Sequence, residues 1–322
     1  MTKRRLGKSD IEVTPIGLGT WQFSMGKGIG GSFWNSLDGD ATKAVVKAAI
    51  DGGIDWFDTA EIYGHGNSER SLAAALASLG YAPGSVRVAT KWWPLFKTAR
   101  NIGATIGDRI DCLSPYPIDL FQIHQRFGLS SIAKQVSAMA DLAEAGKFKA
   151  IGVSNFTAAD IEESCAVLGK RGLPLASNQV RISLLDRSIE RNGLLEAARR
   201  LGVTLIAYSP LAQGILTGRF HDDPNALGSV KRMRRMTSSI RPQTIARTAP
   251  LVAELKKTAA AHSVTTSQVA LNWLVSFWGD TVVAIPGASK PSQASEAAGA
   301  MGFELTRKEL DSIDRISREI AL

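Results

Sequence analysis

Cysteine is scarce in this sequence. Cys112 and Cys165 are the only two among 322 residues, and they match neither a metal-binding spacing nor a disulfide framework. This scarcity excludes the small secreted proteins that depend on several disulfides. It favours a reducing compartment, of which the cytoplasm is the simplest. We therefore expect a cytoplasmic protein without a metal site.

Long apolar runs are missing as well. No uninterrupted apolar segment approaches the roughly 20 residues that a membrane-spanning helix requires. The basic start at residues 1–5 is not followed by the apolar core of a secretion signal. We expect a protein that does not associate with a membrane.

Segments that could serve as linkers are also absent. No run is rich enough in glycine, serine or proline to separate two domains. The composition, 44% hydrophobic and 21% charged, is typical of a soluble globular protein. Since α/β barrels of roughly 250 residues or more form one domain, we expect a single domain over residues 1–322.

Positive charge exceeds negative charge, with a formal net charge of +8 and a pI near 9.6. Such a balance indicates either a nucleic-acid surface or a site for a phosphorylated ligand. The basic run 231–235 lacks interleaved aromatic residues for base stacking, so we expect no nucleic-acid partner. The surrounding segment 213–247 is then either a solvated loop or a flap over bound phosphates. The oligomeric state stays open.

Short apolar segments alternate with amphipathic ones along most of the chain. The sequence predicts a hairpin from 4–7 and 12–15, and strands at 16–20, 54–57, 86–91, 120–124, 150–154, 175–179, 203–208 and 281–286. Predicted helices are 40–50, capped by Asp40, and 68–79, 103–112, 130–145, 157–169, 191–201, 250–262, 266–278 and 291–301. Residues 22–39 are expected to form a long loop.

Eight strands that alternate with helices favour a closed (β/α)₈ TIM barrel with an N-terminal β-hairpin and long strand-end loops. A doubly wound open sheet is the alternative. It is the weaker interpretation, because no Gly-x-Gly-x-x-Gly follows a strand, opens a helix and precedes an acidic residue about 20 positions on.

Four polar residues follow or end three consecutive predicted strands, namely Asp58, Tyr63, Lys91 and His124. A phenol with a pKa near 10 is a weak acid, and a neighbouring cation such as Lys91 lowers that pKa. Asp58 can hold the ammonium group, and His124 can donate a hydrogen bond to a carbonyl oxygen. Singly, each has an ordinary structural explanation as a cap, a solvated charge or a packed side chain.

Aromatic residues also gather on the predicted strand-end loops. Phe33, Trp34, Trp92, Trp93 and Phe127 could line an apolar substrate pocket, or they could be buried against the barrel rim.

The four polar residues, in this order, resemble the catalytic tetrad of the aldo-keto reductase superfamily. Further motifs agree, and the resemblance runs from Arg4 to about Ile313; the motifs are Gly17-Leu18-Gly19-Thr20-Trp21, Ile151-Gly152-Val153-Ser154-Asn155-Phe156, Tyr208-Ser209-Pro210-Leu211 and Ile285-Pro286-Gly287-Ala288. The resemblance implies an enzyme that reduces an aldehyde or ketone with NADPH, with Tyr63 as general acid. A cofactor-bound regulatory subunit with slow turnover is the alternative.

The resemblance also implies where the cofactor binds. Thr20, Trp21 and Asp58 would line the nicotinamide end, Ser154, Asn155 and Gln179 would bind the carboxamide, and Tyr208 would stack on the ring. Ser209, Leu211, Gln213 and Gly214 would wrap the pyrophosphate. The last strand end, with Gly287, and the helix after it would hold the adenosine phosphate through Ser289, Lys290 and Gln293, with Glu296 near the adenine. The family often carries Arg or Lys at the Ser289 or Gln293 position, and Asn where this chain has Ala297. Lys290 is therefore the remaining cation, and NADH stays open as a cofactor.

Overall fold

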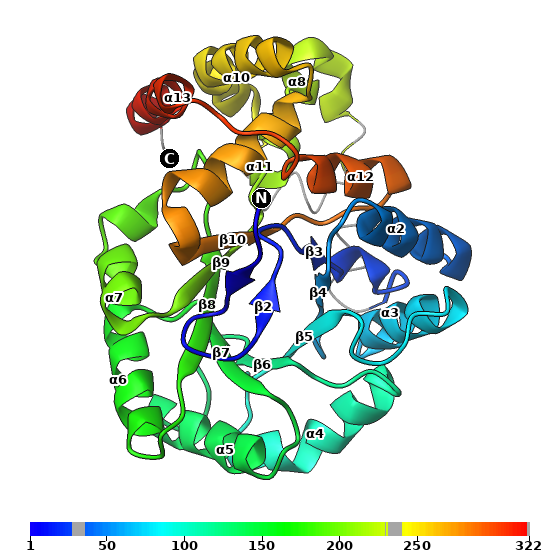
Figure 1. The fold of residues 1–322 in the computed structure, drawn as a ribbon, viewed down its shortest axis with the longest axis vertical. Coiled ribbons are helices and arrows are strands. Elements are labelled where there is room, and N and C mark those ends of the chain that lie inside the picture. The colour runs from blue at the N-terminus through cyan, green and yellow to red at the C-terminus, as the bar shows by residue number, and fades with distance from the viewer. Residues whose placement is uncertain (28–35, 229, 231–239, 321–322) are drawn as a thin grey trace.

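A computed structural model (Figure 1) describes residues 1–27, 36–228, 230 and 240–320. Eight parallel strands pair in sequence order, from β3 to β10. They are β3 Leu18–Gly19, β4 Trp56–Asp58, β5 Arg87–Trp92, β6 Leu120–Ile123, β7 Ala150–Ser154, β8 Leu175–Arg181, β9 Thr204–Tyr208 and β10 Val282–Ile285. Parallel bridges from Ile16 to Ala284 and from Gly19 to Gly287 join the two edges. The predicted barrel is confirmed, and the open-sheet alternative is wrong.

Helices surround this barrel (Figure 1). They are α2 Gly39–Asp51, α3 Asn67–Ser78, α4 Arg100–Leu113, α5 Ile132–Glu144, α6 Ala158–Gly169, α7 Leu194–Leu201, α10 Pro242–His262, α11 Thr266–Phe277, α12 Pro291–Gly299 and α13 Arg307–Ile320. Several begin at side-chain caps, as Thr157 and Asp160 show at α6, where both halves of a capping box form. Asp38, rather than the predicted Asp40, caps α2 and accepts from the backbone of Ala41.

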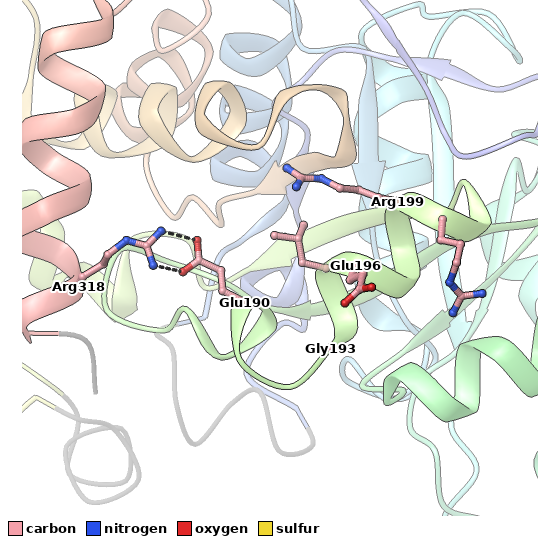
Figure 2. A pocket seen from close by; sticks show the side chains of 7 residues that line it. Glu190, Gly193, Glu196, Arg199 and Arg318 are labelled. Atoms are coloured by element: carbon pink, nitrogen blue, oxygen red, sulfur yellow. Dashed lines mark hydrogen bonds and ion pairs between the residues drawn. The ribbon is translucent and has the colours of Figure 1, made fainter.

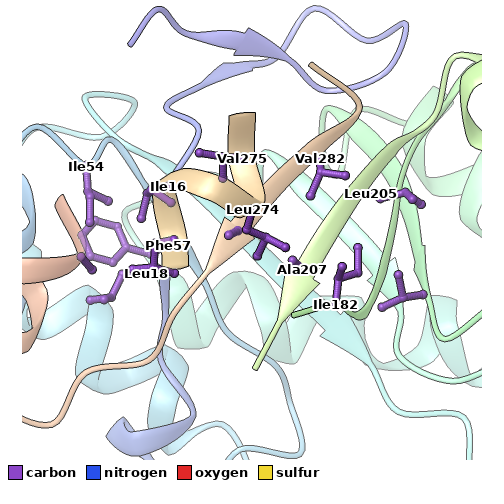
Figure 3. Packing of buried hydrophobic residues seen from close by; sticks show 14 of the residues in the cluster. Ile16, Leu18, Ile54, Phe57, Ile182, Leu205, Ala207, Leu274, Val275 and Val282 are labelled. Carbon is purple, nitrogen blue, oxygen red and sulfur yellow. The ribbon is translucent and has the colours of Figure 1, made fainter. Parts of the chain in front are cut away.

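The barrel has an inner and an outer apolar layer. The predicted hairpin forms from β1 Arg4–Arg5 and β2 Glu12–Val13, and its Leu6, Ile11 and Val13 pack against inward-facing strand residues such as Trp56 and Ile206. The outer layer lies between strands and helices, where Phe57, Leu205 and Val282 face side chains such as Leu274 (Figure 3). Because the hairpin covers the amino-terminal opening, the other opening is left for a site.

Helix α10 begins at Pro242, eight residues before the predicted start at 250. The prediction was wrong because it treated Pro250 as a helix start, whereas Pro250 lies inside the helix. Pro250 and Ala246 are both exposed. The Ala246 carbonyl that loses its intrahelical donor can therefore be hydrated, which lowers the cost of the proline.

The segment 213–247 is structured where it is described. It contains η3 Ala212–Thr217, α8 Arg219–Asp222, η4 Pro224–Leu227 and the first turn of α10. Phe220, Val230 and Ile240 are buried in the main core, so the expectation of a loop is wrong for these residues. The basic run 231–235, on which the flap hypothesis depends, lies outside the described residues, as do Phe33 and Trp34.

Helix α13 was not predicted. Arg187, in the connection after β8, is almost fully buried and donates to Glu190 and to Asp314 of α13. Its guanidinium also lies 5.1 Å from the Trp273 ring, over the aromatic face of α11. A buried arginine from a distant connection thus fixes the C-terminal helix.

Candidate active site

The four tetrad-like residues converge at the carboxyl ends of β4, β5 and β6. Asp58 is the last residue of β4, Lys91 is the penultimate residue of β5, and His124 follows β6. Tyr63 lies in the turn between β4 and α3. The parallel register places Asp58 opposite Ala89, and Lys91 opposite Gln122, so their side chains share one rim of the barrel.

Asp58 and Lys91 form a buried ion pair. Lys91 Nζ donates to Asp58 Oδ1 and, at 2.8 Å, to the carbonyl of Thr59. The other carboxylate oxygen, Oδ2, accepts from Gln122 Nε2 at 3.0 Å and from Gln179 Nε2 at 2.9 Å. Burial lowers the pKa of Lys91, and the Asp58 carboxylate opposes that shift. The hydrogen bonds on both carboxylate oxygens make a buried charge tolerable here.

Sequence reasoning missed Gln122 and assigned Gln179 only to the cofactor carboxamide. Gln122 lies on β6, two residues before His124, which directly follows the strand. Because side chains alternate along a strand, these two positions face the same side, and that spacing was the available signal. The Gln179 amide is already used by Asp58, so its first role in the protein is to hold the carboxylate.

Tyr63 is packed among its predicted partners. Its ring centroid lies 5.1 Å from Lys91 Nζ, 5.7 Å from the His124 ring in an edge-on arrangement and 6.0 Å from the Trp21 ring. Burial, followed by the charge of Asp58, raises the pKa of Tyr63 well above its usual value. The net shift is opposite to the predicted decrease, because burial and the negative charge of Asp58 dominate it. Tyr63 therefore keeps its proton near neutral pH.

His124 is neutral in this setting. Burial, together with the charge of Lys91, lowers the pKa of the imidazole well below its usual value. Its Nδ1 is buried and has no hydrogen-bond partner, which is costly unless a ligand supplies one. Neutral imidazole has one donor and one acceptor nitrogen, so His124 can orient a carbonyl oxygen without carrying charge.

A hydroxyl cluster holds the turn that carries Tyr63. Thr59 Oγ1 donates to Ser68 Oγ at 2.9 Å, and Ser68 Oγ donates to the Thr20 carbonyl at 2.7 Å. Thr20 Oγ1 donates to the Asp58 carbonyl at 3.0 Å. Thr20, which was expected to line the nicotinamide end, is fully buried. Its hydroxyl holds the backbone of Asp58 in place.

The residues expected to bind the carboxamide and to stack on the ring form one network beside the tetrad. Ser154 Oγ donates to the Gln179 carbonyl at 2.8 Å, Asn155 Nδ2 donates to Ser154 Oγ at 3.1 Å, and Tyr208 Oη donates to Asn155 Oδ1 at 3.0 Å. Asn155 is left-handed, with φ of +60°. The structure thus brings Ser154, Asn155, Gln179 and Tyr208 together at the ends of β7, β8 and β9.

The two segments expected to hold phosphate lie at the ends of β9 and β10. Non-glycine residues Ser209, Ala212 and Gln213 have φ of +51°, +46° and +57°, a strained conformation that commonly clusters at functional sites. Leu211 and Gly214 belong to the same tight turn, since Gly214 N donates to the Leu211 carbonyl. Beyond β10, Ser289 N donates to Gln293 Oε1 at 2.8 Å, and exposed Lys290 precedes α12, on which half-buried Glu296 also lies. We call the opening of the barrel at the carboxyl ends of its strands the mouth. A nicotinamide dinucleotide fits there, because the strained turns, the N-terminus of α12 and the unpartnered His124 nitrogen all lie at this opening.

The aromatic side chains divide between mouth and core. Trp93 lies edge-on to His124 at 5.1 Å and to Phe127 at 6.2 Å. Phe96 is 82% exposed on the loop that follows Trp93. Trp92 is instead fully buried and donates to Asn101, so of the two alternatives for this residue, burial is the one found. The strand alternation that brings Lys91 inward turns Trp92 toward α4.

A buried carboxyl lies behind β5. Glu69, on α3, accepts from Thr90 Oγ1 and from Arg109 Nη1, each at 2.6 Å. Burial raises its pKa to about 7, although Arg109 and the Thr90 hydroxyl oppose the shift. Thr90 precedes Lys91 on the same strand, so this cluster supports the site from the helix side. Sequence reasoning did not single out Glu69, whose only signal was its place in an amphipathic helix.

We expect the Glu69 carboxyl to make the protein less stable as the pH rises from about 4.5 to about 7. Its folded pKa of about 7 is above its unfolded value, so the folded state binds the proton more tightly and loses that advantage as the pH rises. The loss is at most about 3 kcal/mol. Urea unfolding of the native protein and of Glu69→Gln at about pH 5 and about pH 8 measures it. An unchanged pH dependence in the variant would contradict the assignment.

A surface cavity of about 510 Å³ lies elsewhere, between α7 and α13 (Figure 2). Its lining residues are Glu190, Gly193, Leu195, Glu196, Arg199, Arg200 and Arg318. Arg318 already donates to both carboxylate oxygens of Glu190. None of the residues expected to be catalytic or cofactor-binding lines it, so the strand-end cluster remains the candidate active site.

Two further absences hold for the described part of the chain. No helix there is long and apolar enough to cross a membrane. The same residues contain no group of three or more His, Cys, Asp or Glu side chains arranged to hold a metal ion.

The barrel and its strand-end site define the class of nicotinamide-dependent oxidoreductases that lack a Rossmann domain. The Aldo/keto reductase family model matches residues 15–318, and the chain belongs to that family. It is accordingly an NAD(P)H-dependent oxidoreductase.

Named relatives extend over nearly the whole chain. An uncharacterized oxidoreductase of Mycobacterium tuberculosis is 36% identical over 310 residues, which is 95% of this chain and 90% of the relative. Pyridoxal reductase of Arabidopsis thaliana is 28% identical and covers 96% of this chain and 84% of its own.

Solved structures agree with the fold. The glycerol dehydrogenase AKR11B4 of Gluconobacter oxydans has a TM-score of 0.81 at 27% identity, over 98% of this chain and 95% of that one. The thermostable aldo-keto reductase Tm1743, solved with the inhibitor epalrestat, has a TM-score of 0.75 at 27% identity, over 98% of this chain and 100% of that one.

Proposed function

We propose that this enzyme reduces an aldehyde or ketone to an alcohol, that NADPH is its preferred reductant and that Tyr63 is the general acid. The observation that supports this most is the neutral phenol of Tyr63, which lies between the buried Asp58–Lys91 pair and the neutral imidazole of His124. The bound cofactor would supply a hydride to the carbonyl carbon. Side chains of the protein itself would donate the proton, stabilise the phenolate and orient the carbonyl.

The protonated state of Tyr63 suits its role. A phenol that keeps its proton until charge develops on the carbonyl oxygen can donate it in the transition state, and such general acid help is typically worth about 10²–10⁴-fold. Lys91 Nζ, 5.1 Å from the ring centroid, would stabilise the phenolate that remains. His124 would orient the carbonyl oxygen beside Tyr63, because its neutral ring can donate one hydrogen bond.

The walls of the mouth favour a substrate with an apolar or aromatic part. Trp93 and Phe127 extend from His124 outward, and the exposed Phe96 continues the surface. Aromatic walls with a few polar groups at the base are typical of small-molecule pockets. Among the relatives, one is named for pyridoxal and one solved neighbour for glycerol, so both compounds belong in a substrate panel.

NADPH absorbance, recorded with 4-nitrobenzaldehyde, pyridoxal, methylglyoxal and a sugar aldehyde, tests the reaction. We expect steady turnover with at least one aromatic aldehyde and, in reverse, oxidation of the matching alcohol. Failure to consume NADPH or NADH with any carbonyl would contradict the proposal. A single slow turnover with tightly retained cofactor would instead favour the regulatory role.

We expect Lys290 to favour NADPH over NADH. Lys290 is exposed at the start of α12, where a 2′-phosphate would meet both its charge and the helix N-terminus. Lys290→Ala should weaken NADPH binding by roughly 5- to 50-fold and leave NADH binding nearly unchanged.

Fluorescence titration with both cofactors measures this preference. Lys170→Ala, which removes a lysine at the end of α6, is the matched control for a lost surface charge. Equal weakening of both cofactors by Lys290→Ala would show that Lys290 does not read the extra phosphate.

A further inference from the structure

Gln22 is a buried glutamine without an evident role inside the protein. It lies in the short helix η1, Trp21–Phe23, which directly follows β3. Its side chain is only 6% exposed, and its Oε1 has no hydrogen-bond partner. Its neighbour Phe23 belongs to the apolar core, so the chain buries an amide where an apolar side chain would pack without this cost.

The Gln22 amide occupies the seam at which the barrel closes. A Cβ added to Gly287 would lie 2.2 Å from Gln22 Nε2 and 2.7 Å from Oε1, so the amide fills the space that a side chain at 287 would take. Gly287 follows β10 and pairs with Gly19, the last residue of β3. Gly287 is itself exposed. The amide therefore lies at the mouth, between the two segments expected to hold opposite halves of the cofactor.

An unpartnered buried amide oxygen is costly, because it has lost the hydrogen bonds that water would give it. His124 Nδ1 is a second buried atom without a partner at the same mouth. Both atoms become satisfied if one ligand enters and offers them hydrogen bonds. A buried polar atom without a hydrogen-bond partner at the mouth thus indicates a contact with a ligand.

The chemistry of the amide selects which part of a dinucleotide it meets. Oε1 only accepts hydrogen bonds, and phosphate oxygens cannot donate to it, whereas ribose hydroxyls can. Gln22 adjoins Trp21, whose ring lies 6.0 Å from that of Tyr63. The adenosine-side candidates Gln293 and Glu296 lie instead on α12.

We propose that Gln22 is a cofactor-positioning residue that accepts a hydrogen bond from a ribose hydroxyl of the nicotinamide half. This inference rests on the proposed function, since it takes the nicotinamide to lie beside Tyr63. The contact fixes the sugar between η1 and Gly287 and so sets where the nicotinamide ring stands over the tetrad.

Gln22→Met, which keeps the side-chain length and removes the amide, tests the contact. Gln135→Met is the matched control, because Gln135 is a buried glutamine on α5 whose Oε1 is also unpartnered. Binding is measured by tryptophan fluorescence with NADPH, with reduced nicotinamide mononucleotide and with 2′,5′-ADP. Thermal unfolding of each free protein is measured in parallel.

We expect Gln22→Met to weaken NADPH and the mononucleotide by roughly 3- to 10-fold and to leave 2′,5′-ADP unchanged. The free variant should unfold at the same temperature as the native protein or at a higher one, because an unsatisfied amide has been removed. Gln135→Met should bind all three ligands as the native protein does.

Three results would overturn the inference: unchanged NADPH binding by Gln22→Met, a loss confined to 2′,5′-ADP, or a lower unfolding temperature with unchanged affinity, which marks a purely structural role. Failure of the native protein to bind either dinucleotide would overturn the proposed function as well, and this separates the two claims.

Discussion

Tyr63→Phe should lower kcat by at least about 100-fold and leave the affinity for NADPH nearly unchanged. The substitution keeps the ring that packs against His124 and Trp21 and removes only the hydroxyl that we propose as proton donor. The loss should appear in kcat and in kcat/KM alike, since the proton is transferred only in the transition state. Steady-state assays with an aromatic aldehyde, together with a cofactor titration, measure both quantities.

Tyr116→Phe is the matched control for this experiment. Its ring is buried away from the mouth, and its hydroxyl donates to the Tyr81 carbonyl at 2.7 Å. This variant should lose about 1 kcal/mol of stability, as is usual for one hydrogen bond, and keep native turnover. Near-native kcat in Tyr63→Phe would mean that another group donates the proton.

Lys91→Met should impair both catalysis and stability. It leaves the Asp58 carboxylate buried without its cation, and breaking a buried pair in this way typically costs about 3–5 kcal/mol. Turnover should fall by at least about 100-fold, because the negative charge of Asp58 would then oppose formation of the Tyr63 phenolate without compensation. Urea unfolding and steady-state kinetics measure the two effects separately.

A double variant separates the structural and catalytic contributions of Lys91. Adding Asp58→Asn to Lys91→Met removes the uncompensated charge, and the amide introduced at position 58 can still meet Gln122 and Gln179, which donate to Asp58 in the native protein. Stability should return to within about 1–2 kcal/mol of native, whereas activity should stay low. Recovery of activity in the double variant would contradict a catalytic role for the ion pair.

Much of the architecture followed from periodicity. Eight strand segments alternating with helices predicted the closed barrel, because parallel strands need crossover helices and a sheet of this kind buries both faces. The errors arose where local signals mislead. Pro250 resembles a helix start but lies within α10, where an exposed face tolerates it. Helix α13 was overlooked although its buried residues Ile313, Ser317 and Ile320 recur at helical spacing.

The sequence by itself determined which residue types stand at the strand ends. Asp58, Lys91 and His124 follow apolar runs of strand length, and parallel strands bring such positions to one rim for geometric reasons. Strand alternation would also have placed Gln122 beside them, since it shares a face with His124.

Only the tertiary structure decided the electrostatic states of these groups. Burial of Tyr63, followed by the nearby charge of Asp58, raises the Tyr63 pKa where the sequence predicted a decrease. The burial of Glu69 against Arg109 and of Gln22 against Gly287 likewise depends on segments distant in the chain. Desolvation and pair distances set pKa values and unsatisfied hydrogen bonds, and neither quantity exists until the chain has folded.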